Sequence, residues 1–196
     1  TTTAIRVSFA GETGWEIHCD MQNIIAIYDA IVLAGTPYNL GHFGMLALDS
    51  MRLEKGYRSW KSDLTSDYTM LESGLGRWIK NGKGDFVGCA ALKAEQKAGL
   101  QRQFVTLTLD DPYDDGTPFG EAVYLSVVQC DGKDAGLVVS AGYGHRVKAS
   151  VAMAVIDCDK LASASIITID VLGRQRVAHW ASSNALYDAE NEKLKG

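Results

Sequence analysis

The sequence has little of what would mark a membrane or secreted protein. No apolar run reaches the ~20 residues that a membrane-spanning helix needs, and the longest run, residues 24–34, is interrupted by Tyr28 and Asp29. The first residues lack the charged and apolar pattern of a signal peptide. We therefore expect no membrane association, and a location in the cytoplasm or, in a eukaryote, in the mitochondrial matrix.

Paired cysteines, metal-ligand spacings and phosphate-binding motifs are absent too. The four cysteines are scattered along the chain, at Cys19, Cys89, Cys130 and Cys158. This scatter favours reduced thiols in a reducing compartment. The four histidines show no metal-ligand spacing, so we expect no bound metal. No nucleophile motif surrounds Ser140. Residues 142–144, Gly-Tyr-Gly, lack the pattern of a phosphate or dinucleotide loop and predict a turn.

An excess of positive charge is also missing. Nineteen Lys and Arg stand against 24 Asp and Glu, which gives a net charge of −5 at pH 7. A nucleic-acid-binding protein usually carries a basic face, so this composition argues against that class. Only 3 prolines accompany 20 glycines, which indicates many tight turns. The 196 residues, 46% of them hydrophobic, suffice for one large globular domain or two small ones.

The N-terminal half mixes strand and helix patterns. Residues 5–9 and 15–19 are β-prone, and the turn residues 11–14 between them predict a hairpin. Asn23 can cap a helix that runs to Ala34, and its apolar spacing predicts one buried face.

Three further helical patterns follow. Residues 41–55 predict a helix, with Gly56 placed just past its end. After an aromatic and polar loop, residues 71–80 and 88–97 are shorter helical patterns. The sequence therefore predicts a mixed helical and β-structure up to about residue 98.

The chain becomes β-rich after residue 98. Six short β-prone runs occur, at residues 104–109, 122–128, 136–141, 151–156, 166–171 and 176–180. Turn residues separate them, at residues 114–116, 131–132, 142–144 and 172–173. Several short strands at this spacing predict a small barrel or sandwich. We therefore expect an α+β protein with a boundary near residue 98.

A carboxylate in the predicted hairpin is the first candidate for ligand binding. Glu16 follows Trp15 on the second strand. Two carboxylate oxygens beside a large ring can accept two parallel N–H bonds from a pterin or a guanidinium edge. Glu12, in the turn, is more simply interpreted as a solvated carboxylate.

An arginine on the second predicted helix is another candidate. Arg52 lies on an otherwise apolar stripe, and a buried unpaired guanidinium is costly. Its partner could be a structural carboxylate, Asp49 or Glu54, or the carboxylate of a ligand. Arg58 and Trp60, in the following loop, could line a ligand site or cover the helix end.

Several of these segments resemble the glycine-cleavage T-protein (aminomethyltransferase) superfamily. That family has a hairpin with the core Gly-Glu-x-Gly-x-Glu-Ile and a helix that ends in Ser-x-Arg-Leu-Glu-x-Gly. The sequence matches these motifs, and the family's downstream segments, at residues 11–17, 50–56, 71–76, 136–144, 151–155 and 185–188. The run Arg-Leu-Glu-Lys-Gly-Tyr-Arg-Ser-Trp is most similar to the branch fused to flavin-dependent dimethylglycine and sarcosine dehydrogenases.

The resemblance implies roles for four residues. Glu16 would hold the pterin edge of tetrahydrofolate, and Arg52 and Tyr187 would also bind ligand. Phe9 stands where the family has a tyrosine near the folate, so the ring is kept and the hydroxyl is lost. The family's catalytic aspartate precedes the hairpin, so the resemblance assigns no catalytic residue to this chain.

The resemblance also implies a fold and a function. Residues 1–98 would be the C-terminal part of a folate-binding α+β domain, and residues 99–196 a small C-terminal antiparallel β-barrel. We predict a fragment of a tetrahydrofolate-dependent one-carbon transfer enzyme with a small N-methyl amine donor, and with FAD in an upstream region or subunit. The isolated fragment would be inactive. The alternatives are a stand-alone aminomethyltransferase, a folate-dependent demethylase and a non-catalytic folate-binding module.

Overall fold

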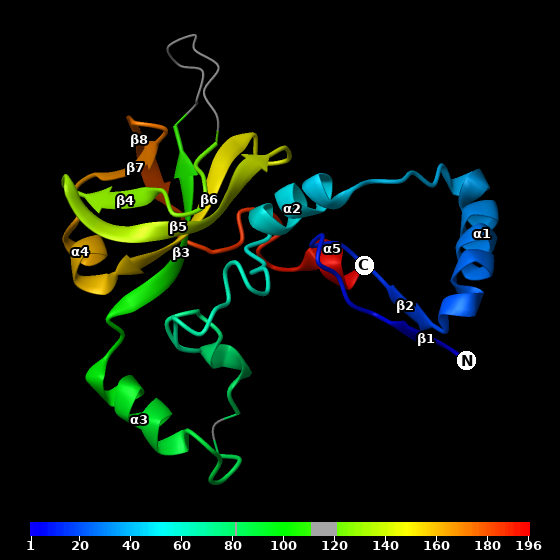
Figure 1. Cartoon of the computed structure of the whole chain (residues 1–196), viewed down its shortest axis with the longest axis horizontal. Coiled ribbons are helices and arrows are strands. Elements are labelled where there is room, and N and C mark those ends of the chain that lie inside the picture. Colours follow the sequence, from blue (N-terminus) through cyan, green and yellow to red (C-terminus); the bar gives the residue numbers. More distant parts are fainter. Residues whose placement is uncertain (81, 111–120) are drawn as a thin grey trace.

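A closed antiparallel barrel forms the C-terminal half of the protein (Figure 1). A computed structural model describes residues 1–80, 82–110 and 121–196. The barrel has the strand order β3-β6-β5-β4-β7-β8. Its strands are β3 (Arg102–Leu109), β4 (Val127–Cys130), β5 (Lys133–Gly144), β6 (Ala149–Asp157), β7 (Ile167–Val171) and β8 (Arg174–Trp180). The predicted α+β class with a C-terminal antiparallel barrel is confirmed.

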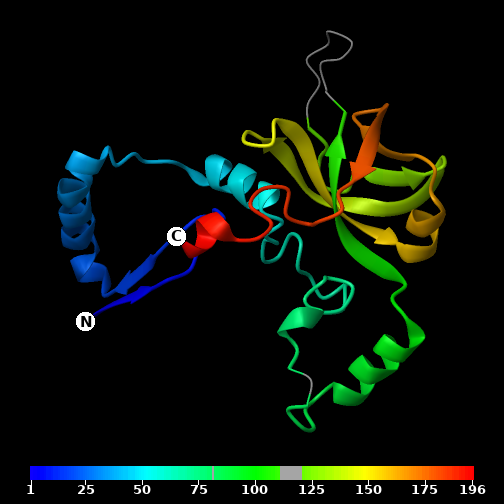
Figure 2. The ribbon, with the colours of Figure 1, turned by 180° about the vertical axis from the view of Figure 1, so that it is seen from behind.

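The remaining elements lie mostly outside the barrel (Figures 1 and 2). A two-stranded sheet pairs β1 (Thr2–Ile5) with β2 (Glu16–Cys19). The α-helices are α1 (Ile24–Gly35), α2 (Met45–Glu54), α3 (Cys89–Ala98), α4 (Cys158–Ser163) and α5 (Glu192–Lys195). Three short 3-10 helices are η1 (Met21–Asn23), η2 (Thr36–Tyr38) and η3 (Gly76–Trp78). None of the helices in the described residues has the length and hydropathy of a membrane span.

Strand β6 divides the core into an inner and an outer layer. Successive side chains on a strand point to opposite faces, and all the residues from Ser150 to Ile156 are buried. One set of alternating residues, including Ala154 and Ile156, belongs to the barrel interior. The other set, including Met153, packs with Leu53 of α2 on the outside of the barrel. Burial of both faces of β6 therefore fixes the end of α2 against the barrel.

Two tight turns of the barrel lie where the sequence predicts them. Asp131 and Gly132 join β4 to β5 with φ angles of 50° and 74°. Leu172 and Gly173 join β7 to β8 with φ angles of 53° and 85°. Positive φ at both central residues matches the twist of a two-residue hairpin. The turn predicted at residues 114–116 lies outside the described residues.

Two other predictions in the barrel are wrong. The strand expected at residues 122–128 begins only at Val127. Residues 142–144 are not a turn but the end of β5, paired with β6. A Cβ atom on Gly142 would lie 3.0 Å from Leu53 Cδ1. The glycine thus serves the close approach of α2 to the strand rather than a change of chain direction.

The N-terminal hairpin has a longer loop than the sequence suggests. Ile5 pairs with Glu16, so β1 ends where the first strand was expected to begin. Residues 6–15 form the loop. Gly11, with a φ of 78°, places its Cα so close to Lys55 that a Cβ would meet that side chain at 2.7 Å. Contact with the end of α2, rather than strand pairing, therefore sets the course of this loop.

Helix α1 has no buried residue, which contradicts the predicted buried face. Asn23 precedes the helix but makes no side-chain cap bond. Figure 1 shows α1 on the far side of the molecule from the barrel. Ile25 and Leu33 are 72% and 77% exposed. The apolar spacing predicted the helix correctly, but no described element covers its apolar face.

The segment between α2 and the barrel is less helical than predicted. Only η3 forms within residues 71–80, since Gly74 has a positive φ of 68°. The later prediction, for residues 88–97, is confirmed by α3. The four cysteines are all unpaired.

Gly56 ends α2 as predicted, and it should tolerate no side chain. Its φ is 71°, and a Cβ there would collide with the backbone carbonyl of Asn184. We expect Gly56→Ala to lower the free energy of unfolding by at least about 1 kcal/mol. Gly173→Ala is the matched control, because Gly173 has a φ of 85° but open space around it. If chemical denaturation shows that both variants lose the same free energy of unfolding, the clash at residue 56 is refuted.

Candidate functional site

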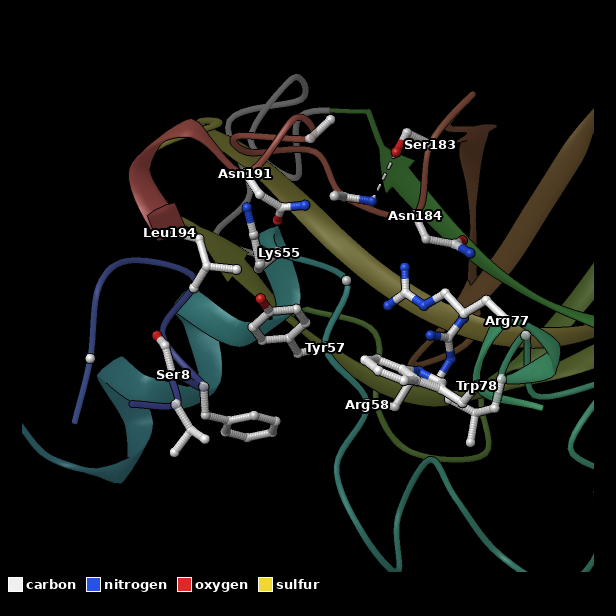
Figure 3. Close-up of a pocket in the computed structure, with 18 of the residues that line it drawn as sticks. Ser8, Lys55, Tyr57, Arg58, Arg77, Trp78, Ser183, Asn184, Asn191 and Leu194 are labelled. Carbon is white, nitrogen blue, oxygen red and sulfur yellow. Dashed lines mark hydrogen bonds between the residues drawn. The ribbon is translucent and has the colours of Figure 1, made fainter. Parts of the chain in front are cut away.

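One cavity lies where four distant segments meet (Figure 3). Its volume is about 960 Å³, in the range of small-molecule sites. The walls come from the hairpin loop, the chain just after α2, the segment around η3, and the C-terminal tail. Figure 2 shows the tail running from the barrel back to the hairpin loop. There Arg6 donates a hydrogen bond to the carbonyl of Lys195.

Aromatic rings form part of the cavity wall. Phe9, from the hairpin loop, stacks on Tyr57, with ring centroids 6.2 Å apart and an interplanar angle of 16°. Trp78, 68% exposed, lines the wall from η3. Figure 3 shows the ring of Tyr57 and the ring of Trp78 on either side of the cavity. Such walls suit a flat ligand, since aromatic rings stack at these separations. The predicted site residue Phe9 thus lies in the cavity.

Two arginines line the cavity beside Trp78. Arg58 lies over the ring of Phe104, with 4.2 Å from Cζ to the ring centroid. Its Nε is buried without a hydrogen-bond partner. Burial, followed by the charge of Arg77, lowers the pKa of Arg58 to about 10, against a smaller effect of Asp63. The sequence allowed Arg58 either to line a ligand site or to cover the end of a helix, and in the structure it lines the cavity.

Arg52 is buried and held by protein groups instead. Its Nε donates to Asp49 Oδ1 at 2.6 Å, its Nη1 to Asp63 Oδ2 at 2.5 Å and its Nη2 to Ser140 Oγ at 2.8 Å. It does not line the cavity. Of the two carboxylates that the sequence suggested, Asp49 is a partner. Glu54 instead accepts the backbone N–H of Arg146 at 2.6 Å.

Asp63 is the residue of this network that the sequence did not reveal. It is fully buried, and it also accepts the backbone N–H of Ser59 at 2.7 Å. It thereby fixes the loop that carries Arg58. A single aspartate in a polar loop gives no signal in the sequence, because only the fold of that loop brings it to Arg52.

Tyr187 lies beside the cavity and joins the tail to the hairpin loop. Its hydroxyl donates to Glu12 Oε1 at 3.2 Å. Arg146 lies over its ring at 4.4 Å and forms an ion pair with Glu12 at 2.7 Å. Glu12 therefore contacts two side chains and is not merely a solvated turn carboxylate. Since the neighbouring Ala185 lines the cavity, Tyr187 positions part of the wall.

Glu16 lies outside the cavity wall. Its side chain is 62% exposed, and its carboxylate contacts His18 Nε2 at 3.2 Å. Gly14, two residues earlier, does line the cavity. The assignment of Glu16 to the pterin therefore stays a prediction.

The tail is anchored to α2 by a buried ion pair. Lys55 Nζ lies 2.8 Å from Asp188 Oδ2, and both side chains are buried. The hydrogen bond from Lys55 lowers the pKa of Asp188 to about 2, helped by backbone N–H groups of Lys193 and Glu192 and opposed by burial. Both residues flank the cavity, so this pair helps to hold its wall.

The anchor predicts a loss of stability in acid. Because the pKa of Asp188 falls below its ordinary 3.8, the ionised carboxylate stabilises the fold fully above about pH 4, and this contribution disappears as the pH falls through about 2. We expect Asp188→Asn to be less stable than the unmodified protein at pH 7. Its stability should also fall less between pH 4 and pH 2. Thermal unfolding followed by circular dichroism tests this. An unaltered acid profile in the variant would contradict it.

Comparison with known proteins gives two family matches. The GCVT N-terminal domain family matches residues 1–83, and the glycine cleavage T-protein C-terminal barrel domain family matches residues 102–188. The solved structure of glycine cleavage system aminomethyltransferase T from Bartonella henselae is similar with a TM-score of 0.79 and 22% identity. It covers 96% of this chain and 50% of that one, which supports the same fold.

Curated relatives are similar at higher identity. Human mitochondrial dimethylglycine dehydrogenase is 35% identical over 174 residues, which are 88% of this chain and 19% of that protein. Human mitochondrial sarcosine dehydrogenase is 32% identical over 200 residues, 98% of this chain and 21% of that protein. The aminomethyltransferase of Caldanaerobacter subterraneus subsp. tengcongensis is 31% identical and covers 78% of this chain. The chain spans about a fifth of the length of the two dehydrogenases and 39% of the aminomethyltransferase.

Proposed function

Because this chain belongs to the glycine-cleavage T-protein (aminomethyltransferase) superfamily, we propose that its cavity is part of a tetrahydrofolate site in a one-carbon transfer enzyme. The similarity to dimethylglycine and sarcosine dehydrogenases supports an enzyme of that type, with an N-methyl amine as donor. Bound tetrahydrofolate would accept the one-carbon unit.

The cavity is the single observation that carries this proposal. Its volume of about 960 Å³ suits a ligand of the size of a pteroylglutamate. Aromatic walls and unpaired cations fit a molecule with a flat heterocycle and a negatively charged end. The buried, unbonded Nε of Arg58 also indicates that a hydrogen-bond acceptor is needed in the cavity.

The residues of this chain would bind and orient the folate rather than perform chemistry. Phe9 and Tyr57 would contact the ligand through their rings. Arg52 would act by holding Asp63 and the loop after α2, and Tyr187 by holding the tail against the hairpin. Positioning of this kind lowers the entropic cost of bringing two reactants together. We assign no catalytic residue here.

We also propose how the chain divides. A boundary near residue 98 would separate the folate-binding part, residues 1–98, from the barrel part, residues 99–196. The tail would be an exception, since it returns from the barrel to the hairpin loop and contributes to the cavity. Flavin chemistry would belong to another region or subunit, and we propose the mitochondrial matrix or the cytoplasm as the location.

Anaerobic titration with tetrahydrofolate tests the proposed function. Calorimetry on the full-length protein should give one saturable site, and bound ligand should quench the fluorescence of Trp78. Trp78→Phe should remove much of this quenching. Trp60→Phe, the control, should retain it, because Trp60 does not line this cavity. Absence of both heat and quenching in the unmodified protein would refute the proposal.

A further inference from the structure

The cavity holds two cations that the protein does not neutralise. Four basic residues line it, but their electrostatic situations differ. Lys55 is paired with Asp188, and Arg6 donates to the carbonyl of Lys195. Within the described part of the chain, no carboxylate forms an ion pair with Arg58 or Arg77. A cation placed next to a like charge without a partner is costly, so this arrangement favours an anionic ligand.

Arg58 is held rigidly in this unfavourable position. Its guanidinium rests on Phe104, and Gly74 approaches it so closely that a Cβ would lie 2.8 Å from Nη2. Asp63 fixes the start of the loop through the N–H of Ser59. Burial, and then the charge of Arg77, lower the pKa of Arg58, as expected for a cation held beside a like charge. Arg58 is therefore prearranged for an anion, with the exposed Arg77 beside it.

We propose that Arg58 and Arg77 bind the glutamyl carboxylates of a pteroylglutamate, an inference that rests on the proposed folate function. Guanidinium groups bind carboxylates in bidentate fashion. Figure 3 shows the two arginines close together beside Trp78, while Tyr57 lies on the other side of the cavity. One side of the cavity thus has the rings of Tyr57 and Phe9 and a lysine that is neutralised by Asp188, and the other side has the two unpaired arginines. A pteroylglutamate has the same polarity, with a flat pterin and an anionic tail.

Another carboxylate could reach the same arginines. An N-methyl amino acid donor also carries a carboxylate, but it is too small to fill both ends of a cavity of about 960 Å³. A ligand that contacts the rings and the arginines at once must be long, which favours the glutamate of a folate as the group bound by the arginines.

A ligand that lacks the glutamate tests the assignment. Calorimetry on the full-length protein should compare tetrahydrofolate with tetrahydropteroate, which lacks the glutamate. We expect Arg58→Gln and Arg77→Gln each to weaken tetrahydrofolate binding at least tenfold and tetrahydropteroate binding less than twofold. The control is Lys61→Gln, which removes an exposed charge from the same loop and should change neither affinity. A third titration uses dimethylglycine.

The possible results separate the inference from the function. If both arginine variants bind the two pteridines as the unmodified protein does, or weaken both equally, the inference is wrong while the folate function stands. If the variants lose dimethylglycine binding and keep tetrahydrofolate binding, the arginines belong to the donor instead. If the unmodified protein binds neither pteridine, the proposed function fails, and the inference fails with it.

Discussion

Replacing Asp63 with alanine is expected to lower the free energy of unfolding by about 3–5 kcal/mol. Asp63 is fully buried and receives hydrogen bonds from Arg52 at 2.5 Å and from the backbone N–H of Ser59 at 2.7 Å. Its removal leaves a buried guanidinium with one carboxylate fewer, and truncation of one partner of a buried pair has a cost of this size. Urea denaturation at pH 7, followed by circular dichroism, measures it.

Two controls identify the origin of this loss. Asp49, the other carboxylate on Arg52, is 48% exposed, so Asp49→Asn should cost no more than about 1 kcal/mol. The double variant Arg52→Met with Asp63→Leu removes both charges and should be more stable than Asp63→Ala, because it leaves no unpaired buried ion. A double variant as unstable as the single one would show that packing, and not the ion pair, accounts for the loss.

The same variant links stability to the cavity. Because Asp63 holds Ser59, its removal frees the loop that carries Arg58. We therefore expect Asp63→Ala to weaken folate binding in protein that is still folded, although Asp63 does not line the cavity.

Local patterns predicted the barrel well and the cavity poorly. The turns at residues 131–132 and 172–173 were predictable because short hairpins need positive φ at fixed positions. Gly142 was wrongly predicted to lie in a turn. The glycine is there because Leu53 packs so close to the strand that a Cβ would crowd it. A glycine in a sequence indicates either a close steric approach or a backbone conformation with positive φ, and only the fold shows which of the two applies.

Contacts between distant segments could not be predicted from patterns. Asp63 meets Ser140, and Lys55 meets Asp188, across separations that no periodicity encodes. The buried face of α1 was predicted from apolar spacing, but spacing cannot tell what covers a face. Recognition of the family motif drew attention to Arg52 and Tyr187, but the side-chain contacts of both are with protein groups, Ser140 and Glu12 among them.

Glu16 is the residue on which the motif and the geometry differ most. The motif predicts a pterin-binding carboxylate, whereas in the structure Glu16 does not line the cavity, is 62% exposed and contacts His18. If the pterin reaches Glu16, Glu16→Gln should weaken tetrahydrofolate binding by roughly 1.5–3 kcal/mol, since one charge-assisted acceptor is lost. This equals about a 10- to 150-fold rise in Kd, measured by calorimetry on the full-length protein.

Asp20→Asn is the matched control for Glu16→Gln. Asp20 is exposed and immediately follows β2, so Asp20→Asn changes the net charge of the same hairpin and leaves Glu16 intact. Unchanged affinity in both variants would remove Glu16 from the site and place the pterin deeper, against Tyr57 and Phe9. A loss confined to Glu16→Gln would instead show that the ligand extends from the arginine pair past the rings to the hairpin, so that one folate occupies the whole length of the cavity.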